Sequence, residues 1–175
     1  MKALLSFAKP RMPEFVETDV NAILHMVAAL AVKNRASLGV GARPVKIVSN
    51  LAPGLPDILA DPMHLQQIFM NLLLNAVDAM PEGGTLTMKT SLDAAVSMVR
   101  IEIADTGKGV ESGVMDKLFQ PFFTTKPKGT GLGLAITKRL VEEHGGEISL
   151  QNNAEGGVTF ILQLPVTQQQ SPVTA

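Results

Sequence analysis

The stretch Asp61–Met80, DPMHLQQIFMNLLLNAVDAM, predicts one amphipathic helix. Its apolar residues recur at intervals of three and four and therefore share one face. They are Leu65, Ile68, Phe69, Leu72, Leu73 and Ala76. Asp61 suits the position that caps a helix, Pro62 suits the first turn, and Pro81 ends the helix.

A second face of this helix carries polar side chains. Asn71, Asn75 and Asp78 lie four and then three residues apart, at the edge of the apolar stripe. Asn is a poor helix former because its amide competes for backbone hydrogen bonds, so two in successive turns ask for a reason. Amide oxygens suit Mg²⁺ that is shared with nucleotide phosphates. Two solvated amides are the alternative, and the helix alone does not separate these interpretations.

The composition limits the class of protein. With 175 residues the chain is most simply one domain, and 46% hydrophobic residues with seven Phe and no Trp or Tyr predict an aliphatic, Met-rich core. The net charge of −1 gives no indication of a nucleic-acid partner. The lack of Cys excludes disulfides, thiolate metal sites and a Cys nucleophile, and it fits a reducing cytoplasm. The longest apolar run, residues 22–32, is too short to span a bilayer, and we find no signal peptide.

The remaining patterns predict an α+β fold, a two-layer sandwich in which a mixed, mostly antiparallel sheet packs on about three helices. The expected strands are residues 45–49, 85–92, 97–104, 147–151 and 158–164, with short ones at 15–18 and 58–60. A helix is expected from Asp19 to about Lys33, and its inward residues would be Ile23, Met26, Val27 and Leu30. Another helix follows Leu132 and ends at Gly145-Gly146.

Residues 105–130 have no usable periodicity, which is typical of a lid or a binding loop. The stretch begins with Asp105–Gly109, DTGKG, directly after a strand. A carboxylate at this point can accept an exocyclic amine such as that of adenine, although an ordinary Asp-Gly turn is the more frequent meaning of this motif alone. Phe119, Phe122 and Phe123 could anchor a closing lid, dock on a partner or simply pin the loop to the body.

Gly129–Leu134, GTGLGL, opens a helix. Glycines at a helix start leave backbone N–H groups bare at the positive end of the helix dipole, which makes a phosphate site. Glycines that only permit close packing are the alternative. Lys126 and Lys128, just before this motif, could reach phosphate oxygens or be solvated loop lysines.

Together, in this order and spacing, the motifs resemble the ATP-binding catalytic domain of sensor histidine kinases, in the superfamily that also contains DNA gyrase, mismatch-repair ATPases and a heat-shock chaperone. The resemblance covers residues 19–165 and is carried by an N box at 61–78 (with Gln67), glycine boxes at 105–109 and 129–134, an F box at 119–123 and a closing strand at 157–165. The sequences FFTTK (122–126) and DAM (78–80) look like the nitrogen-regulator and oxygen-sensor branch.

The resemblance implies a site for ATP and Mg²⁺. It assigns Mg²⁺ and the phosphates to Asn71 and Asn75, and the adenine amino group to Asp105 with Thr159 close by. The other residues that it places at the nucleotide are Gly107, Gly109, Lys126, Lys128, Gly129, Thr130, Gly131, Leu132 and Gly133. Many members of the family carry Lys or Arg where this chain has Asp78. The role of Asp78 is therefore open, and binding a water near the metal is one candidate.

The resemblance also implies a protein-histidine kinase whose acceptor histidine lies on a separate dimerisation domain. His25, His64 and His144 do not fit the acceptor motif, so we assign no catalytic residue. Relatives that hydrolyse ATP carry Glu where this chain has Asn71, and an amide cannot take a proton at neutral pH. We therefore expect the site to position ATP and to neutralise the charge of its phosphates, without efficient hydrolysis of ATP.

By the same resemblance, residues 1–13 are the remnant of a dimerisation helix and its linker, 14–165 the catalytic domain, and 166–175 a disordered tail. This implies a monomeric, cytoplasmic fragment of a parent that is either membrane-anchored or not, with its own dimerisation domain and a response regulator as partners and with no contact to nucleic acid or membrane. Two alternatives stay open. One is a protein-serine kinase of the anti-sigma-factor type, and the other is a nucleotide sensor without chemistry of its own.

Overall fold

The computed structural model describes residues 11–37 and 43–167. The strands are β1 (Val16–Thr18), β2 (Val45–Asn50), β3 (Ile58–Ala60), β4 (Gly84–Asp93), β5 (Met98–Ala104), β6 (Glu147–Asn152) and β7 (Val158–Pro165). The helices are α2 (Val20–Ser37), α3 (Pro62–Asp78), α4 (Ser112–Met115) and α5 (Gly133–Glu143). The expected helix remnant at residues 1–8 and residues 168–175 of the expected tail (166–175) lie outside the described residues. Val166, the first residue of that tail, is bonded through its backbone to Leu59 and Ser97.

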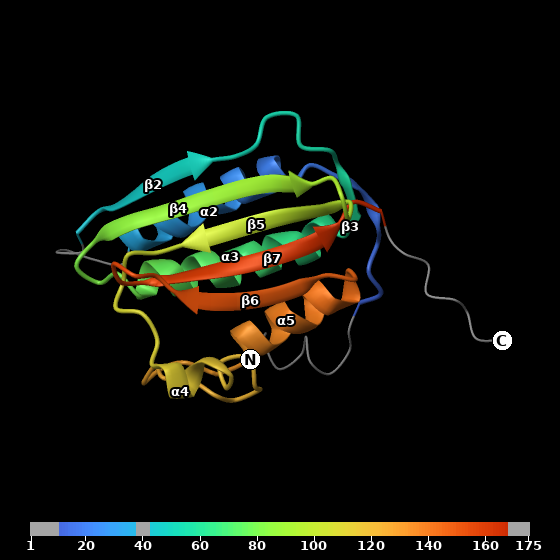
Figure 1. Ribbon diagram of the computed structural model, residues 1–175. Helices are drawn as coiled ribbons and strands as arrows, with labels where there is room; N and C mark the ends of the chain where they lie inside the picture. Colours follow the sequence, from blue (N-terminus) through green and yellow to red (C-terminus); the bar gives the residue numbers. More distant parts are fainter. Residues whose placement is uncertain (1–10, 38–42, 168–175) are drawn as a thin grey trace.

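Five strands form one sheet in the order β2-β4-β5-β7-β6, while β1 and β3 form a separate antiparallel pair. Strands β2 and β4 run parallel and are connected through β3 and α3, and the other neighbouring strands of this sheet are antiparallel. Helices α2 and α3 lie behind the sheet and α5 lies along its β6 side (Figure 1). The two-layer sandwich predicted from the sequence is therefore confirmed. Among the described helices, none combines the length and apolarity needed to cross a bilayer.

Helix α3 is the centre of the core. All six residues of the predicted apolar stripe are buried, and Asp61 caps the helix by accepting the N–H groups of Met63 and His64. On β5 the residues Val99, Ile101 and Ile103 face the helices, as the alternation predicts. The hydrophobic periodicity of the sequence thus correctly predicted the helix and the strand that form the centre of the core.

The expected inward face of α2 was wrong in part. Met26 and Leu30 are 44% and 46% exposed. The inward residues are Val20, Leu24, Val27, Ala28 and Ala31. This helix is apolar around most of its circumference, so the spacing allows more than one inward face. Ala28 and Ala31 on the inner side let α2 lie close to its neighbours. The larger Leu24 and Val27 are buried with them, while Met26 and Leu30 point outward. The Met-rich core is also confirmed only in part, since Met80 and Met88 are buried but Met12 and Met63 are exposed.

Asp61, directly before α3, and His144, directly after α5, are joined by buried hydrogen bonds. The backbone N–H of Asp61 donates to Nε2 of His144 over 3.0 Å, and the His144 Nδ1 lies 2.7 Å from the carbonyl oxygen of Leu140. The Asp61 carboxylate also accepts the N–H of Glu14 over 2.8 Å, which ties the segment before β1 to the same point. Two helices and the entering chain therefore meet at one hydrogen-bonded joint.

Two ionisable groups at this joint, His144 and Asp61, make the stability of the fold depend on pH. Burial lowers the pKa of His144 below its ordinary value of 6.5, and the bond to Leu140 offsets only part of this effect. Burial alone would raise the pKa of Asp61, but the N–H groups of Glu14, His64 and Met63 and the charge of His64 lower it overall. Both groups therefore favour the folded state above their ordinary pKa values.

We predict that unfolding by urea becomes easier as the pH falls from about 7.5 to 5.5. The folded state takes up the His144 proton at a lower pH than the unfolded chain, so its contribution to stability is complete above pH 6.5 and is lost as the pH falls toward the lower pKa. His144→Gln should lose about 1–3 kcal/mol near pH 7.5 because it leaves a buried donor unpaired, and it should flatten the pH profile. His25→Gln, on the exposed side of α2, is the matched control. A flat wild-type profile, or an equal effect of the control, would contradict the assignment.

Candidate functional site

The polar face of α3 lies against the start of α5. The Asn71 amide nitrogen donates to the carbonyl oxygen of Gly133 over 3.1 Å and to Oγ1 of Thr137 over 3.2 Å. A Cβ atom on Gly133 would have only the Asn71 side chain nearby, at 3.9 Å from its Cγ, so the first turn of α5 faces this amide directly. The amide face of α3 therefore meets the second glycine motif at Gly133, the last glycine of that motif.

Asn75 and Asp78 continue the polar face toward the end of α3. A lysine lies across them, and it comes from the long segment that connects β5 to α5 (residues 105–132). The ammonium group of Lys126 is 2.9 Å from Asn75 Oδ1 and 2.9 Å from Asp78 Oδ2. A positive group thus already occupies the position at the predicted metal ligand Asn75. Lys128 is exposed, and within the described ranges it has no ion pair.

The second glycine motif ends at the first turn of α5. The N–H groups of the first helical residues, from Gly133 onward, have no carbonyl acceptor inside the helix. The Leu132 side chain belongs to the core, so only its backbone can contribute to the site, and its N–H is 3.3 Å from Oγ1 of Thr130.

Two glycines of this motif pack inside the long segment itself. A Cβ on Gly131, whose φ is +70°, would come within 2.4 Å of the backbone of Phe122, and a Cβ on Gly129 would meet Oγ1 of Thr124 at 2.4 Å. These two residues therefore hold the long segment compact in this state. Their predicted contact with phosphates requires that segment to move.

The first glycine motif begins with Asp105, whose carboxylate is buried and only 3% exposed. Its Oδ1 accepts the N–H of Gly107 over 2.8 Å and that of Val158 over 3.3 Å, while its Oδ2 has no hydrogen bond to any described residue. Burial raises the pKa of this carboxyl, and the two N–H groups offset part of the rise. One fixed oxygen and one available oxygen on a buried carboxylate are suited to a ligand that brings its own donor.

Gly107 and Gly109 shape the turn after Asp105 in different ways. A Cβ on Gly107 would come within 2.4 Å of the Ala79 carbonyl oxygen, so the glycine allows the strand end to touch the end of α3. Gly109 has a φ of +75°, where a side chain would be strained. The turn after Asp105 and the polar face of α3 are therefore connected through Ala79, directly after α3.

Thr159 does not join the site as the resemblance implied. Its hydroxyl donates to Asn153 Oδ1 over 2.6 Å, and alternation along β7 places it on the face opposite Val158 and Phe160. The residue beside the Asp105 carboxylate is Val158, one position earlier. A one-residue shift changes the face of a strand, which is why the motif alone misplaced this side chain.

Adjacent asparagines at the end of β6, Asn152 and Asn153, were missed by the sequence analysis. Asn153 Nδ2 donates to the carbonyl oxygen of Asp105 over 3.2 Å, and Asn152 Oδ1 accepts the N–H of Val110 over 2.9 Å. They fix the start of the long segment at the end of β5. Two amides in a tight hairpin turn were the available signal, since such side chains often bond to nearby backbone.

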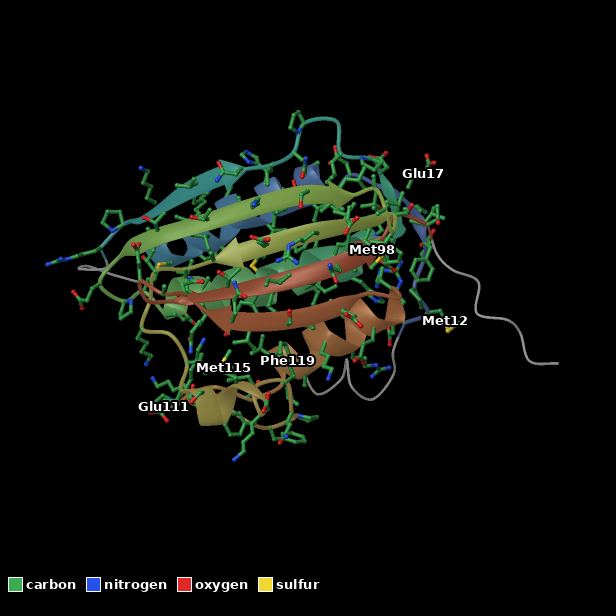
Figure 2. The ribbon with its side chains drawn as sticks, in the orientation of Figure 1. Met12, Glu17, Met98, Glu111, Met115 and Phe119 are labelled. Atoms are coloured by element: carbon green, nitrogen blue, oxygen red, sulfur yellow. The ribbon has the colours of Figure 1, made fainter. Side chains whose placement is uncertain are left out.

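The phenylalanines of the long segment differ in role. Phe119 packs partly against the core and lies with Met115 below β6 (Figure 2). Phe122 is 69% exposed and has a φ of +66°, an uncommon conformation for an aromatic residue. One phenylalanine therefore pins the segment to the body, and another stays at the surface.

The histidines do not reach this site. His25 is exposed on α2, and His144 lies at the opposite end of α5 from the glycine motif. His64 stacks edge-on against His144 with ring centres 5.8 Å apart, and its Nδ1 is the one buried side-chain N or O atom of the described residues that has no hydrogen bond. These positions agree with the expectation that none of the three is a phosphoryl acceptor.

A surface depression of about 450 Å³ lies elsewhere, along β6 and the neighbouring parts of β5, β7 and α5. It is lined by charged groups of both signs, among them Arg100, Lys138, Glu142 and Glu147, and by none of the predicted site residues.

Comparison with known proteins agrees with this geometry. Residues 60–168 match the family described as histidine kinase-, DNA gyrase B- and HSP90-like ATPases. The sensor histidine kinase ZraS of Escherichia coli is 36% identical over 163 residues, which are 93% of this chain and 34% of that protein. The sensor protein FixL of Bradyrhizobium diazoefficiens is 40% identical over 126 residues, which are 71% of this chain and 25% of that protein. The chain thus spans about a third or less of these relatives.

Solved structures give the same result. Full-length ShkA in complex with AMPPNP superposes with a TM-score of 0.81 at 30% identity and covers 99% of this chain, which matches 36% of that chain. The catalytic domain of the histidine kinase ThkA superposes with a TM-score of 0.77 at 29% identity, over 89% of this chain and 97% of that one. The match to isolated catalytic domains over nearly their whole length places this chain in the histidine kinase-, gyrase- and HSP90-like ATPase family, as an ATP-binding catalytic domain of the sensor histidine kinase type.

Proposed function

We propose that the chain binds Mg²⁺-ATP between α3 and the first turn of α5 and directs the γ-phosphoryl group to a histidine on a separate dimerisation domain. The observation that carries this proposal is the contact between the amide face of α3 and the start of α5, with a cation already bonded to Asn75. In the transfer, an imidazole nitrogen of the acceptor bonds to the γ-phosphorus, the bond from that phosphorus to the bridging oxygen breaks, and ADP leaves.

The donor set fits Mg²⁺. Asn71 and Asn75 offer neutral amide oxygens, and the ammonium of Lys126 stands in for a cation at Asn75 Oδ1. When bound, Mg²⁺ would neutralise phosphate charge. Asn71 uses its amide nitrogen to bind α5, so its oxygen is directed by that contact, whereas the Asn75 side chain is bound by the ammonium of Lys126.

Asp105 is suited to recognise adenine. Its Oδ2 can accept the exocyclic amine, because Oδ1 is already fixed by two backbone N–H groups. The turn after Asp105 contacts the end of α3. This arrangement supports a nucleotide whose adenine lies at Asp105 and whose phosphates extend toward α5. We do not include Thr159 in this site.

The chain itself positions the nucleotide and supplies no base for its hydrolysis. The side chain at residue 71 is an amide bonded to α5 and cannot act as a general base for water, so slow hydrolysis is expected. The acceptor histidine and the response regulator come from outside residues 14–165, which we take as the catalytic domain, with residues 1–13 as the link to a dimerisation domain. The TM-score of 0.79 to ThkA in complex with response regulator TrrA, at 27% identity, supports this class of partners. The site of action that we propose is cytoplasmic.

A phosphotransfer assay tests the function. The chain is incubated with Mg²⁺, γ-labelled ATP and the histidine-bearing helical hairpin of ZraS, and we expect an acid-labile, base-stable phosphohistidine on the hairpin. The hairpin with its acceptor histidine changed to Ala is the control. Label on a serine of an added globular protein would favour the serine-kinase alternative. ATP binding with no transfer to either acceptor would favour a nucleotide sensor.

Asn75→Ala should abolish the Mg²⁺-dependent part of ATP affinity, a loss of at least about tenfold, because it removes the ligand oxygen. Its free energy of unfolding should change by less than about 0.5 kcal/mol because its partner is an exposed lysine. Asn71→Ala should instead cost about 1–2 kcal/mol of stability, since it also unties α3 from α5. Calorimetry with and without Mg²⁺ and urea unfolding measure both effects. Unchanged affinity in Asn75→Ala would refute the metal assignment.

Asp105→Asn should separate recognition from stability. The pKa of Asp105 is raised in the folded state, so folding favours its protonated form. The stability that this form contributes is complete below pH 3.8 and is lost as the pH rises through the higher folded value. At pH 7 the variant should be as stable as the wild type or more stable. It should bind ATP about 10- to 100-fold more weakly, because a charged acceptor is lost, and discriminate less against GTP. Equal binding of ATP and GTP by the wild type would remove the basis of this prediction.

A further inference from the structure

The contact between Lys126 and Asp78 joins residues 48 positions apart in the sequence. Neither side chain is buried, with 44% and 58% of their surfaces exposed, and an ion pair this exposed adds little to folding stability. What the contact does is fix the position of a lysine from the long segment, over the amide face of α3.

Helix α3 cannot supply positive charge to a triphosphate by itself. Between Pro62 and Asp78 it contains no Lys or Arg, and its last turn ends on a carboxylate. By simple electrostatics, Asp78 would repel phosphates that approach Asn75. A cation at this wall has to come from another element, and Lys126 is the one that lies there.

We infer that Asp78 is a positioning residue that holds Lys126 as the phosphate-binding cation of the α3 wall. This inference rests on the proposed function and deepens it. An ammonium group has three N–H donors. Without nucleotide, two of them reach Asn75 and Asp78. Once Asn75 gives its oxygen to the metal, Lys126 keeps the bond to Asp78 and has two donors for phosphate oxygens.

The sign of one substitution separates this inference from the simple electrostatic view. If Asp78 only adds negative charge near the phosphates, then Asp78→Asn should tighten the binding of Mg²⁺-AMPPNP. If Asp78 positions Lys126, the same change should weaken binding several-fold. Lys126→Met should weaken it about tenfold through loss of a charged donor.

Calorimetry on four proteins makes the test: wild type, Asp78→Asn, Lys126→Met and the double variant, each titrated with Mg²⁺-AMPPNP and with AMP. We expect the double variant to bind Mg²⁺-AMPPNP no more weakly than Lys126→Met, because Asp78 acts only through the lysine. AMP affinity should stay the same, which a merely structural defect would not allow. Lys117→Met removes an exposed lysine from the same segment and should have no effect.

A relocated charge gives a second readout. Asp78→Lys in the Lys126→Met background puts the cation directly on α3 and should recover most of the lost affinity. Tighter or unchanged binding by Asp78→Asn, or additive losses in the double variant, would overturn the inference. If those results came while Asn75→Ala still lost its Mg²⁺-dependent affinity, only this inference would fail. A wild type that bound no nucleotide would defeat the proposed function as well.

Discussion

The hydrogen bonds from Asn71 to Gly133 and Thr137 are the contact on which the site depends. They hold the amide face of α3 against the first turn of α5, where backbone N–H groups have no acceptor inside the helix. At the start of α3 and the end of α5, Asp61 and His144 make a second connection, so α5 is tied to α3 at both of its ends. With both ends joined, the spacing between the two walls is fixed by the protein before any ligand binds.

Few charged groups lie between the amide face of α3 and the start of α5. The amides are neutral, the start of α5 contributes the positive end of its dipole, and the one lysine at the α3 wall comes from the long segment. Binding a triphosphate therefore couples the position of that segment to the occupancy of the site. The same segment is fastened at its start by Asn152 and Asn153 and is held partway along by Phe119.

Much of this could be predicted from the sequence, because α3 and the β4–β5 hairpin carry clear hydrophobic periods and the glycine motifs have defined spacing. The inward face of α2 could not, since a helix that is apolar on most sides has no unique phase. The position of Thr159 failed for a different reason, because a strand motif read one residue out of register points to the wrong face. The pairing of Lys126 with Asp78 could not be foreseen, because nothing local links residues so far apart.

The most direct test of the account is a crystal structure of the chain with AMPPNP and Mn²⁺, in which the anomalous signal locates the metal. We expect the metal at coordination distance from Asn75 Oδ1, the phosphates between α3 and the start of α5, and the adenine amine at Asp105 Oδ2. Nucleotide density elsewhere, for example in the depression along β6, with Lys126 still bonded to Asn75, would contradict the account.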